Sequence, residues 1–473
     1  MTTSVALTAV EAAPSRHPGP SARRRRILAL WNLGAVCAVW GTSLYVVALW
    51  VAGGGVDAVV TGTAEALQSL GRLTGLVAAN LLLYQVLLMA RVPLFERGFG
   101  RVALTRMHRL VGFWSLWLMC AHIVLLVFGY AIAAGVGPWT QLWQFVWDYP
   151  GMLLATAASL LIVMVAITSI RRARRRLKYE SWHLLHLYAY IGVGLAVPHQ
   201  LWAGADFTAS PAATVYWWLL WAAAAAAVIA YRVVLPVVRS LRADLRVAAV
   251  EPDGSGGVTV RVRGRHSRGI RAQSGQFFIW RFLDGPGWTR GHPFSLSAAP
   301  REGELALTAS IVGDGTARLA RVRPGSRVLV EGPFGHFTGD VRTGRRLVLI
   351  GAGAGVAPLV SLLEGEPYAP GDAVLITRDS GRGAPILAAA VSRLVAERGI
   401  LHIPLSGPRG AKGWLPGSHA AWRGADALVH LLPDIAERDA YVCGPQAWMD
   451  AVVADLRAAG VPSARIQTES FAV

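Results

Sequence analysis

The segment Leu104–Tyr130, LTRMHRLVGFWSLWLMCAHIVLLVFGY, is an apolar run that contains two histidines, His108 and His122. An apolar helix of about 18 residues or more is long enough to cross a hydrocarbon core roughly 30 Å thick. The histidines are 14 residues apart, which on an α-helix is about 21 Å of rise and only about 40° away from a common face. Ionisable side chains within a membrane are costly and usually functional. The segment therefore predicts a membrane span that carries functional groups at two depths.

Five further apolar runs of about this length lie in the first half of the chain: Ile27–Val51, Leu73–Ala90, Gly151–Ile170, Trp182–Trp202 and Thr214–Leu235. The whole chain of 473 residues is 54% hydrophobic and 16% charged, whereas soluble domains have roughly 25% charged residues. The first half is therefore predicted to be an all-α bundle of six transmembrane helices.

The connections between these runs alternate in charge. The N-terminal tail and the second and fourth connections are rich in arginine, whereas Gly53–Gly71, Ala131–Pro150 and Ala203–Thr214 contain no lysine or arginine. Because positive loops stay inside, both termini are expected to be cytosolic in a multi-pass protein of the cell membrane, with lipid as its partner. The net charge of +18 does not favour nucleic-acid binding, because the basic residues separate apolar runs rather than form one stripe.

Three more histidines, His183, His186 and His199, lie in the fifth predicted span. The third and fifth spans run in the same direction, so the first histidine of one is level with the first histidine of the other. Neutral imidazole is a common axial ligand of haem iron. This arrangement predicts an inner haem between His108 and His186 and an outer haem between His122 and His199.

The fifth span fits this arrangement less simply than the third. His186 and His199 are 13 residues apart, roughly 140° from a shared face in an ideal helix. Pro198 is expected to kink the helix and correct the mismatch. His183, one turn earlier than His186, remains the alternative inner ligand.

The cysteines exclude several kinds of site. Cys37, Cys120 and Cys443 are far apart, and none belongs to a CxxC pair. A disulfide framework, a structural zinc site and a four-cysteine iron–sulfur cluster are therefore not expected.

The region from Leu241 to Asp340 contains short strands separated by glycine and proline, which predict a small antiparallel barrel. It also contains the sequences RGHPFS at Arg290–Ser295, GDGT at Gly313–Thr316 and EGPFG at Glu331–Gly335.

The remaining region alternates strands and helices, which is typical of a parallel α/β sheet. A strand at Arg346–Ile350 leads into GAGAGVAP at Gly351–Pro358 and then a helix. Such a turn lets the backbone approach a diphosphate at a helix N-terminus. Two more strands end at Arg378 and at Cys443-Gly444-Pro445.

These motifs, in this order, resemble the ferredoxin-NADP reductase superfamily. The His-Pro-Phe-Ser form of the first motif, together with Tyr179–His186 and His199, resembles the ferric reductase and NADPH oxidase branch, over about Ile27–Val473. The expected domains are a basic tail (1–26), a six-helix di-haem domain (27–238), an FAD-binding antiparallel β-barrel (241–340) and an NAD(P)-binding α/β domain (341–473).

The resemblance implies roles for individual residues. It implies that the flavin is lined by His292, Pro293, Phe294 and Ser295, with Ser295 near the reactive edge, and that the FAD diphosphate is bound by Gly313 and Thr316. It implies that the nicotinamide nucleotide is held by Gly351, Gly353, Gly355, Pro358, Cys443, Gly444 and Pro445. Phe471 would cover the flavin, and the catalytic set would be Ser295, Cys443 and Phe471. Arg378 is placed to read a 2′-phosphate, which favours NADPH over NADH.

The resemblance therefore implies a transmembrane oxidoreductase that moves electrons from cytosolic NAD(P)H, through FAD and two b-type haems, to an external acceptor. The acceptor is expected to be a small molecule, such as a ferric chelate, oxygen or a quinone, or a partner protein, and no residue of the sequence decides among them. Two alternatives stay open: a haem-binding membrane redox sensor, and a flavin reductase that is merely anchored by helices and binds no haem.

Overall fold

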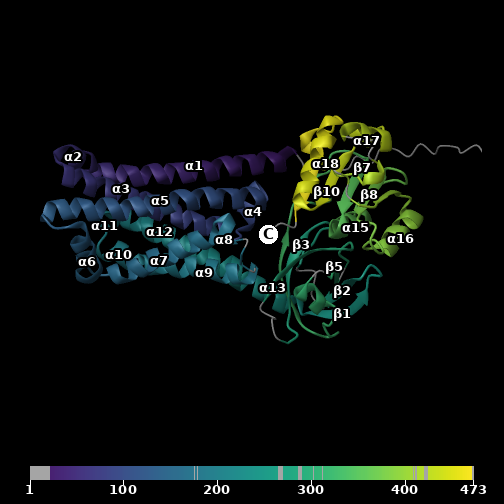
Figure 1. The fold of residues 1–473 in the computed structure, drawn as a ribbon, viewed down its shortest axis with the longest axis horizontal. Helices are drawn as coiled ribbons and strands as arrows, with labels where there is room; N and C mark the ends of the chain where they lie inside the picture. Colours follow the sequence, from purple (N-terminus) through teal and green to yellow (C-terminus); the bar gives the residue numbers. More distant parts are fainter. Residues whose placement is uncertain are drawn as a thin grey trace, which may run out of the picture. The chain divides into compact units, whose positions relative to one another are not determined.

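The computed structural model describes residues 22–174, 176–177, 179–264, 270–285, 290–301, 303–311, 313–408, 410, 413–419 and 424–470. The chain divides into two compact units (Figure 1). One comprises Arg26–Pro236 and is helical, and the other is built mainly from Val237–Val473 and contains the sheets.

The helical unit is dominated by six long helices: α1 (Ala22–Ala52), α3 (Thr63–Met89), α5 (Arg101–Ala134), α7 (Met152–Ser169), α9 (Tyr179–Leu195) and α12 (Pro211–Val228). Shorter helices connect them: α2 (Gly55–Thr61), α4 (Pro93–Phe99), α6 (Pro138–Asp148), α8 (Arg171–Arg174), α10 (Val197–Trp202) and α11 (Ala205–Thr208). A π-helical turn, Ile229–Val234, continues α12 into α13 (Leu235–Ala243). Helices α3 and α5 pack along each other, as do α7 and α9.

Among the described residues, five helical segments are long and apolar enough to cross a membrane: Leu30–Ala52, Thr63–Met89, Ala103–Ala134, Met152–Ser169 and Pro211–Ala243. The predicted count of six is therefore not confirmed. The predicted span Trp182–Trp202 is divided, because α9 ends at Leu195 and α10 begins at Val197. Pro198 lies in the first turn of α10 and has no N–H to continue the α9 ladder. The predicted interruption before His199 is thus confirmed.

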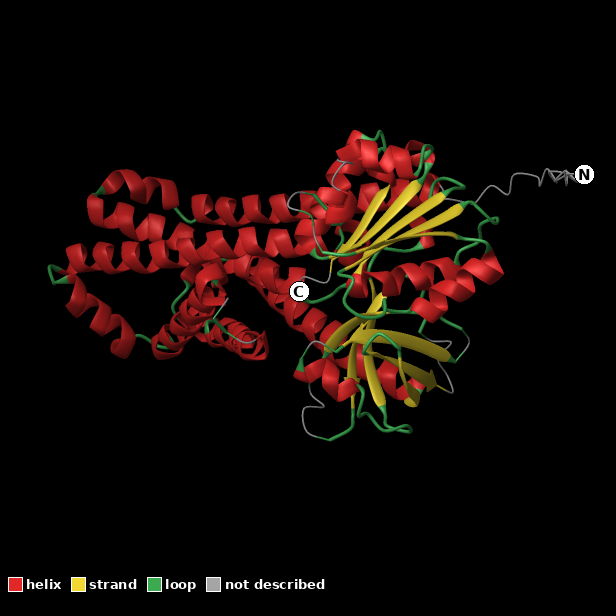
Figure 2. Ribbon diagram, turned by 45° about the vertical axis from the view of Figure 1, so that its right-hand side comes forward, coloured by secondary structure: helices red, strands yellow, loops and turns green. Residues whose placement is uncertain are grey.

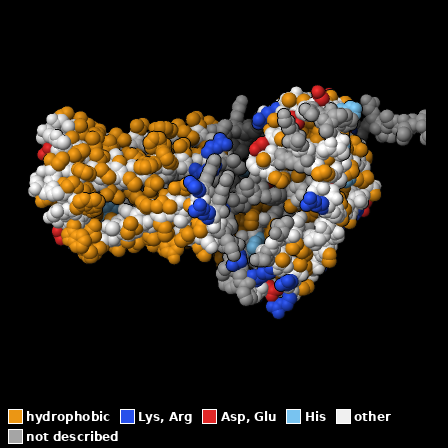
Figure 3. Space-filling view, in the orientation of Figure 1, with side chains coloured by type: hydrophobic (Ala, Val, Ile, Leu, Met, Phe, Trp, Pro, Cys, Tyr) orange, Lys and Arg blue, Asp and Glu red, His pale blue; other side chains and the backbone are white. Residues whose placement is uncertain are grey.

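The surface of the helical unit is apolar. Trp40, Leu160 and Leu219 are exposed to 66%, 66% and 65%, and in Figure 3 hydrophobic side chains cover most of the visible face of this unit. Large exposed apolar surfaces are unfavourable in water but suit contact with lipid. The helical unit is thus that of a multi-pass membrane protein.

Six antiparallel strands form the first part of the other unit. One sheet has the order β1 (Leu245–Pro252), β2 (Gly257–Gly264), β5 (Glu304–Ser310), and the second has the order β4 (His292–Ser295), β3 (Phe277–Phe282), β6 (Val328–Phe334). The predicted antiparallel pairing is confirmed.

The predicted closed barrel is not observed in the described strands. The two sheets are joined by isolated bridges, Arg246–Arg327 and Leu296–Leu307, rather than by continuous ladders. One reason is that β4 has only four residues and contains Pro293, which lacks a backbone donor. The sheets nevertheless share one core, in which Trp280 and Leu307 are fully buried.

The second part of this unit is a parallel α/β fold, as predicted. Its five strands have the order β11 (Ile466–Ser470), β10 (Asp439–Gly444), β7 (Leu347–Ala352), β8 (Ala373–Asp379), β9 (Leu401–Ser406), and all neighbours are parallel (Figure 2). Helices α15 (Val356–Gly365), α16 (Ala388–Arg398), α17 (Gly424–Leu431) and α18 (Gln446–Ala458) accompany the strands. Strands β7, β8 and β10 are buried along nearly their whole length, as expected for a sheet covered on both faces.

Replacement of Leu307 tests the shared core of the two antiparallel sheets. Leu307→Ala removes a fully buried side chain and should destabilise this unit by about 2–5 kcal/mol. Resistance of the full-length protein to thermolysin across a urea series would measure the change. Leu401→Ala, at a half-exposed position on the edge strand β9, is the control. Equal midpoint shifts for the two variants would contradict the assigned core.

Candidate functional site

Helix α5 directs two of the predicted histidine ligands toward backbone carbonyls of α3. His108 Nδ1 lies 3.3 Å from the Gln85 carbonyl oxygen, and His122 Nδ1 lies 2.8 Å from that of Gly71. The two carbonyls are 14 residues apart on α3, the same spacing as the histidines on α5. A neutral imidazole that donates from Nδ1 keeps its lone pair on Nε2, and metal-ligating histidines usually have such a partner.

The contact at His122 requires a glycine on the facing helix. A Cβ atom on Gly75 would lie 2.4 Å from His122 Nδ1, which is far inside van der Waals contact. Gly75 follows Gly71 by one helical turn, so the missing side chain makes room for the ring to reach the Gly71 carbonyl. Neither the carbonyl partners nor this glycine were identified from the sequence.

His108 and His186 are brought together, as predicted for the inner pair. Their ring centroids are 6.0 Å apart with an interplanar angle of 65°. Two imidazoles bound to opposite sides of one metal ion, each about 2 Å from it, have centroids about 6 Å apart. His186 Nδ1 lies 3.2 Å from Ser169 Oγ, and Trp182 packs beside both His186 and His183, with ring centroids 5.1 and 6.4 Å apart. This geometry favours His186 over His183 as the partner of His108.

One member of the second pair lies just after the break between α9 and α10. His199 belongs to α10. His199 Nδ1 is buried and has no hydrogen-bond partner among the described residues. The turn before α7 packs against it, since a Cβ atom on Gly151 would lie 2.9 Å from the His199 backbone nitrogen. The break between α9 and α10 thus releases His199 from the helical face that carries His186. In the part of the chain described, no cluster of three or more His, Cys, Asp or Glu side chains suits a metal ion.

In the sheet-containing unit, the sequence His292-Pro293-Phe294-Ser295 forms the whole of β4. Trp280 on β3 donates from Nε1 to the Phe294 carbonyl oxygen at 3.0 Å, which fixes this strand. Ser295 is 4% exposed, and its buried hydroxyl has no hydrogen-bond partner in the described structure. A buried hydroxyl without a partner is costly, so this group suits a bound ligand.

The turn that follows β5 lies against the same strand. The Gly313 backbone N–H donates to Thr316 Oγ1 at 3.2 Å at the start of α14 (Asp314–Leu319). A Cβ atom on Gly315 would lie 3.0 Å from His292 Cε1. The two motifs predicted to bind the flavin are therefore adjacent in the structure, although Gly313 comes 18 positions after Ser295 in the sequence.

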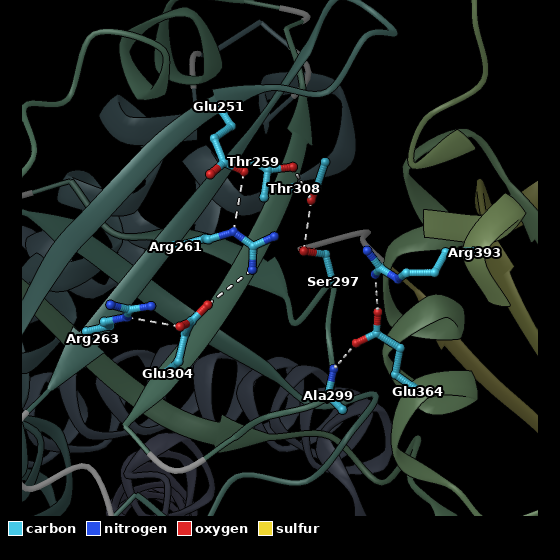
Figure 4. A network of polar contacts seen from close by, with 10 residues as sticks. All are labelled: Glu251, Thr259, Arg261, Arg263, Ser297, Ala299, Glu304, Thr308, Glu364 and Arg393. Carbon is cyan, nitrogen blue, oxygen red and sulfur yellow. Dashed lines mark hydrogen bonds and ion pairs between the residues drawn. The ribbon is translucent and has the colours of Figure 1, made fainter. Parts of the chain in front are cut away.

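A polar network fixes the chain immediately after Ser295 (Figure 4). Thr308 donates to Ser297 Oγ at 2.8 Å, and the Ala299 backbone N–H donates to the Glu364 carboxylate at 3.0 Å. Glu364 also accepts from Arg393 on α16 at 3.0 Å. This segment is thus tied both to β5 and to the helices of the parallel sheet. No pattern in the sequence indicates these contacts.

The glycine turn after β7 is shaped by the neighbouring strand β10. Gly353 has a φ of +54°, and a Cβ atom on Gly355 would lie 2.2 Å from the Cys443 carbonyl oxygen. Gly351 is the partner of Cys443 in the sheet register, and Pro358 is buried in the first turn of α15. The turn therefore leads directly into a helix N-terminus, where backbone N–H groups attract phosphate.

Cys443, with Gly444, ends β10, and Pro445 follows as the N-cap of α18. Burial raises the pKa of the Cys443 thiol well above its usual value, and the charge of the adjacent Glu469 raises it further. A Cβ atom on Gly335 would lie 3.2 Å from the Glu469 carboxylate and 3.4 Å from the Phe277 ring.

Phe277 is the register partner of Ser295, so the structure brings the predicted flavin strand and the predicted nicotinamide strand into one neighbourhood. Phe471, also predicted for this site, lies outside the described residues.

A cavity of about 110 Å³ opens beside the glycine turn, at the ends of β7 and β8. Its lining includes Gly353, Thr377, Arg378 and His402. Arg378 is 8% exposed and bonds to the backbone carbonyls of Leu405 and Asp379. Thr377 Oγ1 lies 2.8 Å from His402 Nε2, and burial lowers the pKa of His402. Arg378 was predicted here, whereas Thr377 and His402 were missed, although both lie on strands next to the turn.

Comparison with known proteins agrees with the motifs. Residues 74–197, which include His108, His122 and His186, match the family described as ferric reductase like transmembrane component. NADPH oxidase 1 of Mus musculus is 36% identical over 104 residues, which cover 20% of this chain and 17% of that protein.

Two bacterial proteins show further similarity. The ferredoxin–NAD(+) reductase component of the alkene monooxygenase system of Xanthobacter autotrophicus is 32% identical over 42% of this chain and 61% of its own length. The haem-binding subunit of a protein-methionine-sulfoxide reductase of Xanthomonas axonopodis is 33% identical over 29% of this chain and 60% of its own length. The chain thus spans less than two thirds of the length of these relatives.

Among solved structures, the FAD/NAD binding domain of a nitric oxide dioxygenase from Vibrio cholerae is 22% identical, covering 49% of this chain and 99% of that domain, with a TM-score of 0.40. The resemblance inferred from the sequence motifs is confirmed by the family match and the curated relatives.

Gly355→Ala tests the turn between β7 and α15. The added methyl group would collide with the Cys443 carbonyl and push the helix N-terminus away from a bound diphosphate. We expect NADP⁺ binding, measured by calorimetry, to weaken at least about tenfold, or about 1.4 kcal/mol. Gly417→Ala is the control, because its nearest neighbouring atom is 4.0 Å away. Unchanged binding in Gly355→Ala would contradict the assignment.

The raised pKa of Cys443 predicts slow alkylation. Because the thiolate is the nucleophile, the native protein should leave Cys443 unmodified by iodoacetamide at pH 7–8 and react there only as pH rises well above the usual thiol pKa of about 8.5. Peptide mass spectrometry would measure modification, with a urea-unfolded sample as the positive control. Rapid labelling of Cys443 in the native protein near neutral pH would disprove its burial as a neutral thiol.

Proposed function

We propose that this chain is a membrane oxidoreductase that takes electrons from cytosolic NAD(P)H and delivers them across the bilayer, with FAD and two b-type haems as cofactors. The relatives support an NAD(P)H-dependent oxidoreductase. The observation that carries the haem assignment is the pair His108–His186, whose 6.0 Å centroid separation suits one metal ion between the rings. When bound, FAD and haem would supply the conversion of a two-electron donor to one-electron transfer.

Four histidines would hold the two haems: His108 with His186, and His122 with His199. The α3 carbonyls orient His108 and His122 through Nδ1, which leaves Nε2 to bind iron. Ser169 Oγ, 3.2 Å from His186 Nδ1, would orient that ring. The two carbonyl contacts would fix the tautomer and ring direction of His108 and His122 before any metal is present.

The soluble residues have separate tasks in the proposal. His292, Phe294 and Ser295 would line the flavin, and the Gly313–Thr316 turn would approach its diphosphate. The Gly351–Gly355 turn and Pro358 would position the second nucleotide so that its nicotinamide lies by Cys443. Since Cys443 is a neutral thiol, its role there is to shape the pocket, not to act as a nucleophile. Arg378, in the cavity beside the turn, favours NADPH.

The direction of transfer follows from the charge of the connections. With arginine-rich connections inside, both termini and the sheet-containing unit are cytosolic. With an inside-negative potential, outward movement of one electron is favoured by an electrical free energy of about 2.3 kcal/mol per 100 mV. A ferric chelate or oxygen is the proposed external acceptor.

Paired histidine variants test the haem assignment. His108→Ala or His186→Ala should each remove about half of the b-type signal in a reduced-minus-oxidised spectrum, as should His122→Ala or His199→Ala. A double variant within one pair should lose no more than either single variant, because one haem needs both ligands. A double variant that takes one histidine from each pair should lose the whole signal.

His183→Ala is the matched control and should keep the full signal. A wild-type protein with no b-type signal would leave only an anchored flavin reductase. A full signal in all four single variants would contradict the ligand assignment. Steady NADPH consumption after addition of an acceptor would distinguish an enzyme from a redox sensor.

A further inference from the structure

Helix α6 (Pro138–Asp148) has four distinct stripes, each made of residues four apart. The first is apolar, the second consists of Trp139, Trp143 and Trp147, the third is polar with Thr140, Gln144 and Asp148, and the fourth faces the protein with Gln141 and Phe145. Phe145 is buried and packs against Tyr130 of α5, with centroids 5.3 Å apart. At about 100° per residue, the tryptophan stripe lies between the apolar and the polar stripe.

The described part of the chain leaves the three tryptophans uncovered. Trp139, Trp143 and Trp147 are exposed to 83%, 67% and 54%. Three such rings on one face form an apolar surface that water alone would not favour. Their position next to a polar stripe suits a boundary between an apolar and an aqueous phase, where indole rings are enriched.

The neighbouring helices hold α6 at the end of the bundle. Only residues 135–137 separate it from α5, and only residues 149–151 separate it from α7, both of which are long enough to cross a membrane. Three extended residues reach about 10 Å. Figure 1 shows α6 at the end of the helical unit opposite to α4 and α8. The helix has no lysine or arginine, so an acidic surface is not its target.

We propose that α6 is an interfacial helix that inserts Trp139, Trp143 and Trp147 into the headgroup–acyl boundary of the leaflet on the arginine-poor side. The occupant of this face is lipid, and the polar stripe of Thr140, Gln144 and Asp148 faces water. Such a helix, with an apolar face and a polar face, lies in the membrane plane.

This position has a consequence for the second histidine pair. The turn that follows α6 ends at Gly151, which packs against the backbone of His199. Lipid contact on α6 would therefore restrict the turn at residues 149–151, which packs against the backbone of His199.

Two adjacent residues provide a matched test. Cys37 and Cys120 are replaced by serine, and a fluorescent maleimide is attached to Trp143→Cys or to Gln144→Cys in the full chain in phosphatidylcholine vesicles. The label at position 143 should be quenched by a lipid that carries a nitroxide near its headgroup and protected from iodide. The label at position 144 should instead be quenched by iodide and little affected by the nitroxide lipid. Leu160→Cys, on the exposed middle of α7, should respond instead to a nitroxide deep in the acyl chain.

Trp139→Cys, on the same stripe, repeats the test if the first variant does not fold. Equal iodide quenching at positions 143 and 144 would place α6 in water and overturn the proposal. Protection of position 143 from both quenchers, lost when the ratio of protein to lipid is lowered, would show that a second copy of the chain covers this face, and would also overturn it.

Discussion

The packing of α5 against α3 is the contact on which the proposed electron path depends. Two imidazoles on α5 reach two carbonyls on α3, and both pairs have the same spacing along their helices. A carbonyl oxygen has two lone pairs, so it can stay in the helix ladder of α3 and still accept from a histidine. Each carbonyl gives the single N–H of a neutral imidazole a partner within an apolar environment, where a charged imidazolium would be costly. It also fixes the direction of Nε2 without help from a ligand.

A comparable constraint organises the parallel sheet. The Cys443 carbonyl occupies the space where a side chain at residue 355 would be, so the turn can approach β10 only with glycine there. The same cysteine is next to Glu469, whose carboxylate lies near Gly335. The ends of β10 and β11 thus connect the glycine turn after β7 to the antiparallel sheet that contains β4, the strand predicted to line the flavin. The network around Glu364 then ties that sheet to α15 and α16.

The sequence predicted elements whose patterns are local. Apolar length identified the long helices, glycine turns and strand ends identified the parallel sheet, and the spacing of His108 and His122 identified two levels in one helix. The barrel was not confirmed, because closing it depends on how many ladder bonds join distant strands, which local patterns do not contain. Six spans were not confirmed because Pro198 divides the fifth run. The carbonyl partners were missed because every residue has a carbonyl, so no residue type indicates which of them accepts from a side chain.

The interruption at Ala196, between α9 and α10, changes the direction in which His199 can point. An unbroken helix would turn His199 roughly 140° away from the face of His186, so the two histidines could not serve centres on one side. Ending α9 at Leu195 and restarting at Val197 releases that constraint, and Pro198 makes the restart favourable because a proline in the first helical turn loses no ladder bond. As a result, α9 alone is shorter than α7 and α12, and α10 extends it. The turn at Gly151 packs against the backbone of His199 in the restarted helix, so this proposed ligand is contacted by a neighbouring loop and does not depend on the face of α9 that carries His186.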